Sequence, residues 1–475
     1  MWYKMKILMV SSESNPLFKC GGLADVVYSL SKKFITYKQR VIILTPFYKK
    51  IIRHFDESKK EIFFQTNINF KNKLITVNYI KYIYDDIEFW LVENDEYFNR
   101  DNIYGYEDDE ERFLFFSLAS AALISKKHVS FDIIHLHDWH TGLIPGILFQ
   151  EMIVPKFIYT IHNPLFKGNI SLQRLKEYYG ELELPRKIKN NLDYISMLET
   201  GIIMSSKVST VSPNHSIELL RDERYGLKET LANRGNDFVG ILNGIDVNEF
   251  NPNKDNYINH NYCVDNVLCY KKENKYELCK KYNLSNPEYP LYGIVTRLTY
   301  QKGIPLILDS LDELVKMNCN FIFLGVGDKE IENKLQEYQN RYNDKIRVIF
   351  SYSDEIAHQI YASSDFFLMP SFYEPCGIGQ MIALRYGSIP IVREVGGLKD
   401  TIVSFNGLNE DEATGLSFYS YTKEAFLLAM NNSLELYLNK RTFAIIVHNG
   451  MHQDNSWTKS YKEYLSLYND AILNR

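Results

Sequence analysis

The sequence predicts an α/β protein built from two Rossmann-like, doubly wound domains that face each other across a cleft. Short, continuous apolar runs recur along the chain, polar or glycine-containing turns follow these runs, and segments with helical apolar spacing lie between them. Continuous rather than alternating apolar runs are typical of parallel strands buried on both faces. The pattern occurs in both halves of the 475 residues, a length that suits two or three domains.

Composition narrows the class of protein further. Apolar residues make up 45% of the chain, which is typical of a folded globular protein. The 54 Lys and Arg residues nearly balance the 59 Asp and Glu residues, so nucleic acid is not an expected partner. None of the six cysteines forms a Cys-X-X-Cys pair, and no apolar segment is long enough for a signal peptide or a membrane span. We therefore expect a cytoplasmic protein without a membrane partner.

Five strands are predicted in the first half of the chain. They cover residues 6–11, 40–46, 131–137, 156–162 and 207–212. A helix is expected after Leu23, because Val26, Val27 and Leu30 follow at helical spacing. The acidic run at residues 107–111 is interpreted as a solvated face.

A second series of five strands begins after residue 285. These strands cover residues 291–296, 320–325, 347–350, 365–370 and 388–392. Pro305 stands at the predicted start of a helix, where its missing N–H costs nothing. Residues 251–286 show little periodicity, so we place the link between the domains within this segment or just before it. The final helix is marked by Tyr461, Tyr464, Leu465, Tyr468 and Ile472.

Ligands of doubly wound sheets bind at the carboxyl ends of the strands, which is where the search for functional residues begins. Gly21 and Gly22 follow the first predicted strand and open a helix, so their backbone N–H groups could approach an anion, with the charge of Lys19 nearby. A plain tight turn explains the same glycines equally well.

Three histidines and an aspartate at residues 135–140 suggest a metal site as an alternative. The spacing resembles that of dinuclear zinc hydrolases, but Asp138 comes one residue too early and Trp139 stands in its place. We therefore favour hydrogen-bonding residues at a strand end. His162 and Asn163 follow a neighbouring strand in the same way.

In the second half, Arg297 and Lys302 bracket a loop between a strand and a helix, and such a pair can hold a diphosphate. Glu374 precedes a glycine-rich helix start, where an acceptor-only carboxylate suits sugar hydroxyls. Gly396 and Gly397 form a second glycine pair after a predicted strand, like Gly21 and Gly22. The sequence contains no Walker lysine loop and no complete dinucleotide fingerprint, so ATP hydrolysis and dehydrogenase chemistry are not favoured.

Together these motifs resemble the bacterial glycogen synthase and plant starch synthase family of retaining glucosyltransferases. Six motifs of that family occur in order, at residues 19–23, 137–140, 161–163, 243–246, 297–303 and 374–377. One departure is Phe166-Lys167-Gly168, where the family often has Tyr-Gln-Gly.

The resemblance implies a GT-B fold, with domains at residues 1–250 and 251–455 and a helix at 456–475 that packs back on the first domain. It implies transfer of glucose from ADP-glucose to the non-reducing end of an α-1,4-glucan such as glycogen or starch, with retention, no metal and no cofactor. No carboxylate is placed as an obvious nucleophile, so we favour a front-face displacement assisted by the leaving phosphate.

The resemblance also assigns site residues. The predicted catalytic residues are His162, Arg297, Lys302 and Glu374. The predicted sugar-nucleotide-binding residues are Lys19, Gly21, Gly22, Asp25, Asp138, Asn163, Asn243, Tyr352, Cys376, Gly377 and Gly379.

Three alternatives remain open at this point. The first is another GT-B transferase that uses UDP-glucose or a different acceptor, such as a sucrose-synthase-like enzyme. The second is the dinuclear metallohydrolase built on His135, His137 and His140. The third is a catalytically silent glycan-binding protein, which the intact set of charged residues disfavours.

Overall fold

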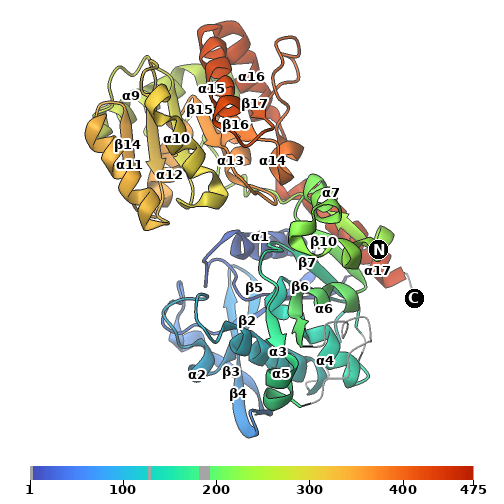
Figure 1. Ribbon diagram of the computed structural model, residues 1–475. Coiled ribbons are helices and arrows are strands. Elements are labelled where there is room, and N and C mark those ends of the chain that lie inside the picture. Colours follow the sequence, from blue (N-terminus) through green and yellow to red (C-terminus); the bar gives the residue numbers. More distant parts are fainter. Residues whose placement is uncertain (1–3, 127–129, 154, 181–192, 474–475) are drawn as a thin grey trace. The chain divides into compact units, whose positions relative to one another are not determined.

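A computed structural model describes residues 4–126, 130–153, 155–180 and 193–473 of the chain. The chain divides into two compact units (Figure 1). The N-terminal unit contains Met1–Asn243 and Trp457–Arg475, and the C-terminal unit contains Gly244–Ser456. The first boundary of this division precedes residue 250.

The N-terminal unit is built on a nine-stranded sheet with the order β11-β10-β7-β6-β1-β2-β5-β4-β3. Its strands are β1 (Lys6–Val10), β2 (Arg40–Pro46), β3 (Glu61–Phe70), β4 (Lys73–Tyr84), β5 (Ile87–Glu93), β6 (Ile133–His137), β7 (Phe157–Ile161), β10 (Lys207–Thr210) and β11 (Phe238–Gly240). From β11 to β5 every neighbouring pair is parallel, whereas β3 and β4 pair antiparallel. The five predicted strands are confirmed. The hairpin at the edge was not predicted because its strands are half-exposed and alternate with polar residues.

Nine helices of the described residues belong to this unit, together with a small sheet of β8 (Asn169–Ser171) and β9 (Tyr194–Ser196). The helices are α1 (Gly22–Thr36), α2 (Asp95–Phe98), α3 (Asp109–Lys126), α4 (Ile144–Gln150), α5 (Leu172–Tyr178), α6 (Met197–Met204), α7 (Pro213–Arg221), α8 (Lys228–Ala232) and α17 (Trp457–Leu473). The helix predicted after Leu23 is confirmed as α1. The ring of Phe34 in α1 stacks on that of Tyr468 in α17, with centroids 5.0 Å apart, so the final helix of the chain packs on this unit.

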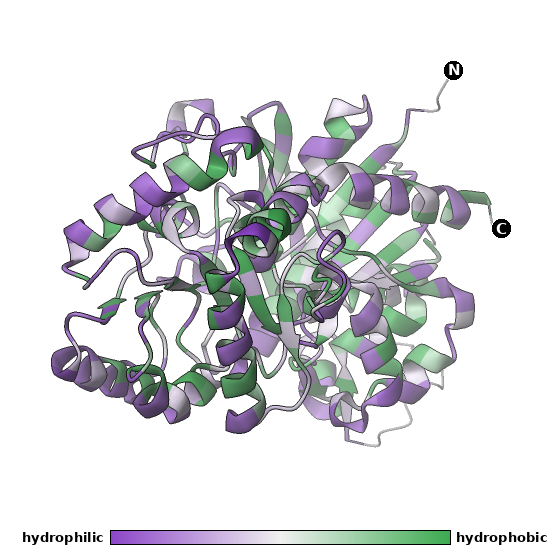
Figure 2. Cartoon of the chain, turned by 90° about the horizontal axis from the view of Figure 1, so that it is seen from above, coloured by the Kyte–Doolittle hydropathy of each residue, from purple (hydrophilic) through white to green (hydrophobic). Residues whose placement is uncertain are grey.

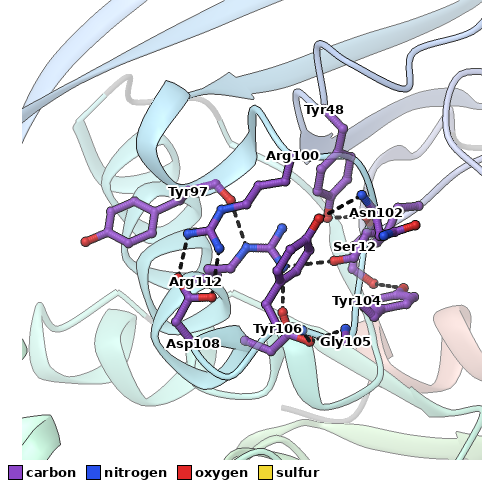
Figure 3. A network of polar contacts seen from close by, with 12 residues as sticks. Ser12, Tyr48, Tyr97, Arg100, Asn102, Tyr104, Gly105, Tyr106, Asp108 and Arg112 are labelled. Carbon is purple, nitrogen blue, oxygen red and sulfur yellow. Dashed lines mark hydrogen bonds and ion pairs between the residues drawn. The ribbon is translucent and has the colours of Figure 1, made fainter.

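The interpretation of the acidic run at residues 107–111 as a solvated face holds only in part, because Glu107 is exposed whereas residues 108–111 are half-buried. Asp108 forms an ion pair with Arg100 (Figure 3). Asp109 forms one with the fully buried Arg112. Arg112 also donates from Nε to the carbonyl of Tyr97 at 2.8 Å. A run of like charges in the sequence does not reveal the arginines that the fold brings to it.

The C-terminal unit has a six-stranded, fully parallel sheet with the order β14-β13-β12-β15-β16-β17. Its strands are β12 (Leu291–Val295), β13 (Asn320–Leu324), β14 (Ile346–Ile349), β15 (Phe366–Met369), β16 (Ile389–Arg393) and β17 (Leu416–Phe418). Its helices are α9 (Val267–Tyr282), α10 (Ile304–Leu314), α11 (Lys329–Arg341), α12 (Asp354–Ser363), α13 (Gly379–Arg385), α14 (Gly396–Thr401), α15 (Lys423–Leu438) and α16 (Lys440–His452). The predicted second strand series is confirmed to within a residue or two at each end, and Pro305 lies in the first turn of α10.

Helix α9 lies within residues 251–286, where the sequence shows little periodicity. Its buried positions include polar side chains, so apolar periodicity is weak in the sequence. Lys271 donates from Nζ to the carbonyls of Tyr361 and Tyr386, each at 2.9 Å. Lys275 lies 2.6 Å from a carboxylate oxygen of Asp365. The helix is held by buried hydrogen bonds that a hydrophobic pattern cannot reveal.

The core of each unit lies along its sheet. In Figure 2 the central strands are coloured as hydrophobic, and the outer faces of many helices are hydrophilic. Strands β1 and β13, for example, are buried along most or all of their length. Among the described residues, no helix is both long and apolar enough to cross a membrane.

Candidate active site

The predicted site residues gather at the strand ends that the topology singles out. In the N-terminal unit β1 lies between β2 and β6, and in the C-terminal unit β12 lies between β13 and β15. The strand order therefore reverses beside each of these central strands. Ligands of doubly wound sheets bind at the carboxyl ends of the strands at such a switch point. The segments that follow β1, β6, β12 and β15 carry most of the predicted residues.

The loop between β1 and α1 is organised by Glu13, a residue that the sequence did not single out. The side chain of Glu13 is buried, and its Oε2 accepts hydrogen bonds from the backbone N–H groups of Cys20 at 2.5 Å and Gly21 at 3.1 Å. Burial raises the pKa of Glu13 to about 6, and the two N–H groups oppose that rise. The amides of Cys20 and Gly21 thus already hold an anion from the protein itself.

Glu13 is supported by the polar network that surrounds it. The hydroxyls of Ser12 and Tyr104 lie 2.7 Å apart, and Tyr48 donates to the carbonyl of Ser12 at 2.9 Å (Figure 3). In the same loop, Lys19 pairs with Asp25 at 3.0 Å while both side chains stay partly exposed. The charge of Lys19 is therefore positioned at the surface of this unit. Gly22 is exposed at the first position of α1.

Asp138 connects the ends of β6 and β7. It is buried, and its Oδ1 accepts from the backbone N–H of His162 at 2.7 Å and of Asn163 at 3.2 Å. Its φ of 57° is unusual for a residue other than glycine, which marks a backbone that the surroundings hold in a strained form. Burial raises the pKa of Asp138 to about 7. The structure thus brings three predicted site residues into direct contact.

The histidines of β6 form hydrogen bonds within the protein. His135 contacts the hydroxyl of Tyr468 through Nδ1 at 2.7 Å and that of Thr160 through Nε2 at 2.6 Å. Because both ring nitrogens of His135 are engaged, they are not arranged as metal ligands. Among the described residues, no three His, Cys, Asp or Glu side chains gather in a way that could hold a metal ion. This geometry does not support the dinuclear hydrolase alternative.

His162 is the predicted catalytic residue at the end of β7. It is half-buried, and its Nε2 lies 3.0 Å from Nδ1 of His137. Burial lowers the pKa of His162 to about 3, so the ring is neutral at physiological pH. Its neighbour Asn163 accepts from the backbone N–H of Leu165 at 3.2 Å.

In the C-terminal unit, Lys302 and Glu374 form a direct ion pair of 2.6 Å between Nζ and Oε2. The same carboxylate oxygen accepts from the hydroxyl of Ser371 at 3.1 Å, and Ser371 is itself buried. Lys302 follows β12 and Glu374 follows β15, so the pair joins the ends of two adjacent strands.

Close backbone contacts fix the loops that carry this pair. Gly303 has a φ of 73°, and a Cβ at this position would overlap the carbonyl of Pro370. A Cβ on Gly397 would overlap the carbonyl of Cys376, and the N–H of Gly397 donates to the carbonyl of Pro375 at 3.1 Å. Gly396 and Gly397 therefore pack directly against the backbone of the Glu374 loop.

Other predicted residues lie apart from these clusters. Arg297 is exposed and donates to the side chain of Gln301 at 3.5 Å. The side chain of Tyr352 is 75% exposed. Asn243 is buried at the last position of the N-terminal unit, and its Oδ1 has no partner among the described residues.

The remaining predicted residues surround the start of α13. Cys376 is buried, Gly377 has a φ of 74°, and Gly379 is the first residue of the helix. Gln380 donates from Nε2 to the carbonyls of Cys376 at 3.2 Å and Gly377 at 3.1 Å. These contacts fix the turn that leads from Glu374 into the helix.

Three supporting residues were missed by the sequence analysis: Glu13, Ser371 and Arg393. Arg393 donates to the carbonyl of Phe372 at 2.8 Å and thereby holds the loop before Glu374. Glu13, Ser371 and Arg393 each lie within two residues of the end of a predicted strand, which was the only signal that pointed to them. In the structure Arg393 is the last residue of β16.

Comparison with known proteins identifies the family. Residues 6–233 match the family described as the starch synthase catalytic domain, and residues 277–444 match glycosyl transferases group 1. The glycogen synthase of Caldicellulosiruptor bescii is 39% identical over 485 residues, covering 99% of this chain and 100% of that protein. The chain belongs to the glycogen synthase and starch synthase family. The glycogen synthase of Clostridium botulinum strain Alaska E43 is 37% identical over 98% of this chain and 99% of that protein, which supports the same family.

Solved structures place this synthase-family chain among the GT-B glycosyltransferases. The catalytic domain of starch synthase IV from Arabidopsis thaliana, bound to ADP and acarbose, matches with a TM-score of 0.89 and 28% identity. The match covers 99% of this chain and 100% of that one. Sucrose-phosphate synthase from Thermosynechococcus elongatus matches with a TM-score of 0.64 and 15% identity over 99% of this chain and 100% of that one, which shows a shared fold alone. The predicted GT-B fold is confirmed.

Proposed function

We propose that this member of the glycogen synthase family transfers glucose from ADP-glucose to the non-reducing end of an α-1,4-glucan, with retention of configuration. The full-length similarity to glycogen synthases supports the reaction class. The ADP in the related starch synthase structure supports an adenine nucleotide as the donor's carrier. We also propose that the protein acts in the cytoplasm, because its cysteines suggest a reducing compartment.

The observation that carries this proposal is the Lys302–Glu374 pair at the ends of β12 and β15. A lysine ammonium suits a diphosphate, and a carboxylate that only accepts hydrogen bonds suits sugar hydroxyls. Arg297 lies in the same loop as Lys302 and is exposed, so its guanidinium is accessible to a second phosphate oxygen. Cys376, Gly377 and Gly379 would contribute backbone contacts to the nucleotide, as the family resemblance implies.

The N-terminal unit would contribute the polar groups around the sugar. Asp138 orders the backbone of His162 and Asn163, which positions both side chains at the end of β7. Asn243 offers a buried carbonyl oxygen that lacks a partner among the described residues. Lys19 and Asp25, next to Gly21 and Gly22, would contact the sugar nucleotide, and Tyr352 would pack near the base.

In the proposed reaction, the bond between C1 of glucose and the β-phosphate oxygen breaks, and its electron pair leaves with ADP. The 4-hydroxyl oxygen of the glucan forms the new bond to C1 on the same face, and its proton passes to the departing phosphate oxygen. Arg297 and Lys302 stabilise the negative charge that grows on the diphosphate. No protein nucleophile takes part in this scheme.

The test is incorporation of labelled glucose into glycogen, measured in parallel reactions with ADP-glucose and UDP-glucose as donors. We expect incorporation from ADP-glucose at the higher rate. Preference for UDP-glucose would replace the proposed donor but keep the reaction, whereas no incorporation from either donor would refute the proposal.

A further inference from the structure

The ring of His162 is held by a second histidine of the same unit. His137 is the last residue of β6, His162 follows β7, and these strands are neighbours in the sheet. Nδ1 of His137 and Nε2 of His162 lie 3.0 Å apart. Two ring nitrogens at this distance form a hydrogen bond only when one of them carries a proton and the other does not.

Both rings are neutral, so this hydrogen bond contains a single proton. Burial lowers the pKa of His137 well below its ordinary value, and the nearby His135 and His162 lower it further. Burial also lowers the pKa of His162. Each neutral ring carries one N–H, and the question is which ring donates.

The other nitrogen of His137 decides between the two possibilities. Nε2 of His137 is buried and has no partner among the described residues. The neighbouring ring of His135, whose centroid lies 4.1 Å away, already uses both of its nitrogens. If His162 donated, the proton of His137 would sit on Nε2 as an orphaned, buried N–H, which proteins rarely tolerate. If His137 donates, only an unused lone pair remains there.

We propose that His137 is a positioning residue that donates from Nδ1 to Nε2 of His162 and thereby fixes the proton of His162 on Nδ1. His162 then meets its ligand as a neutral hydrogen-bond donor. Asp138 restrains the same residue through its backbone N–H, so both the main chain and the ring of His162 are fixed. This functional consequence rests on the proposed glucosyl transfer. In that reaction the Nδ1–H of His162 would donate a hydrogen bond to an oxygen lone pair of the sugar.

Three substitutions of His137 separate the proposal from a general effect on folding. In His137→Asn the side-chain amide replaces Nδ1 and can still donate to His162. In His137→Gln the amide reaches the position of Nε2 instead, and in His137→Leu the donor is lost. His140→Asn is the control, because His140 is a buried histidine of the same motif without a hydrogen bond to His162 in the described structure.

The direct readout is the ¹⁵N NMR spectrum of the full-length protein labelled at histidine, with the His162 signals assigned by comparison with His162→Gln. We expect the wild type, His137→Asn and His140→Asn to carry the His162 proton on Nδ1. His137→Gln and His137→Leu should move it at least partly to Nε2. If His137→Leu does not fold, the Asn and Gln pair makes the same comparison.

Kinetics give the second readout. We expect a loss of kcat of about tenfold or more in His137→Gln and His137→Leu and near-complete recovery in His137→Asn, because one hydrogen bond to a reacting ligand is at stake. A wild-type protein with the His162 proton on Nε2, or a spectrum unchanged by His137→Leu, would overturn the proposal. Failure of the wild type to transfer glucose would instead refute the proposed function and leave the NMR result standing.

Discussion

Nζ of Lys302 lies 2.6 Å from Oε2 of Glu374, and the two side chains are only 17% and 7% exposed. Removing one partner of a mostly buried pair leaves the other charge uncompensated, which costs about 3 kcal/mol. We expect Lys302→Met and Glu374→Gln each to lower the free energy of unfolding substantially, and the double variant to cost less than their sum. Urea unfolding of the four proteins measures this coupling, and additive losses would show that the pair is not coupled.

Arg297 should affect catalysis without affecting stability. Its guanidinium is exposed, so Arg297→Ala should change the free energy of unfolding by no more than about 0.5 kcal/mol. The same change should lower kcat about a hundredfold, because a charge that stabilises the leaving diphosphate is lost. Arg441, whose side chain is 82% exposed, provides the matched control, and Arg441→Ala should leave kcat unchanged. Equal kinetics for the two variants would remove Arg297 from the proposed site.

Gly397 should be required for the shape of the Glu374 loop. A Cβ at Gly397 would overlap the carbonyl of Cys376, so Gly397→Ala must displace the loop and should cost about 1–3 kcal/mol together with most of the activity. Gly407 has a φ of 93°, and a Cβ at this position would meet no other atom within 4 Å, so Gly407→Ala tests backbone strain alone. We expect Gly407→Ala to lose stability but to keep its activity. Thermal unfolding and transfer rates distinguish the two outcomes.

Glu13 should make stability depend on pH. Burial raises its pKa from 4.5 to about 6, so between these values the folded protein keeps a proton that the unfolded chain has released. Its contribution to stability is therefore complete below pH 4.5 and is lost as the pH rises through 6, by about 2 kcal/mol. Glu13→Gln cannot titrate but can still accept hydrogen bonds from Cys20 and Gly21.

The stability advantage of the wild type over Glu13→Gln should consequently shrink by about 2 kcal/mol between pH 4.5 and 7. Urea unfolding of both proteins across this range measures the difference. A difference that stays constant with pH would contradict the assignment of this titration to Glu13.

The sequence predicted the strands whose side chains are apolar because they are buried on both faces of a sheet. Strands β1 and β12 are continuous apolar runs because parallel strands inside a doubly wound sheet are covered on both faces. The polar residues that follow such strands, including Asp138 and Glu374, were found because ligand sites of this fold lie at the strand ends.

Features that depend on tertiary partners could not be predicted. Helix α9 buries Lys271 and Lys275, whose hydrogen-bond partners lie about a hundred residues away along the chain. The glycines after β1 suggested amides open to a phosphate, yet Glu13 accepts hydrogen bonds from Cys20 and Gly21. Nothing local distinguishes an amide that binds a ligand from one that binds a carboxylate of the same chain.

The proposed reaction is a retaining transfer of glucose to an α-1,4-glucan. The most direct test is the reaction of ADP-glucose, labelled with ¹³C at C1, with a short maltooligosaccharide, followed by NMR of the anomeric carbon in the product. We predict a new α-1,4 linkage at the non-reducing end, with one ADP released for each glucose transferred. A β linkage, or ADP release without a labelled oligosaccharide, would contradict the claim.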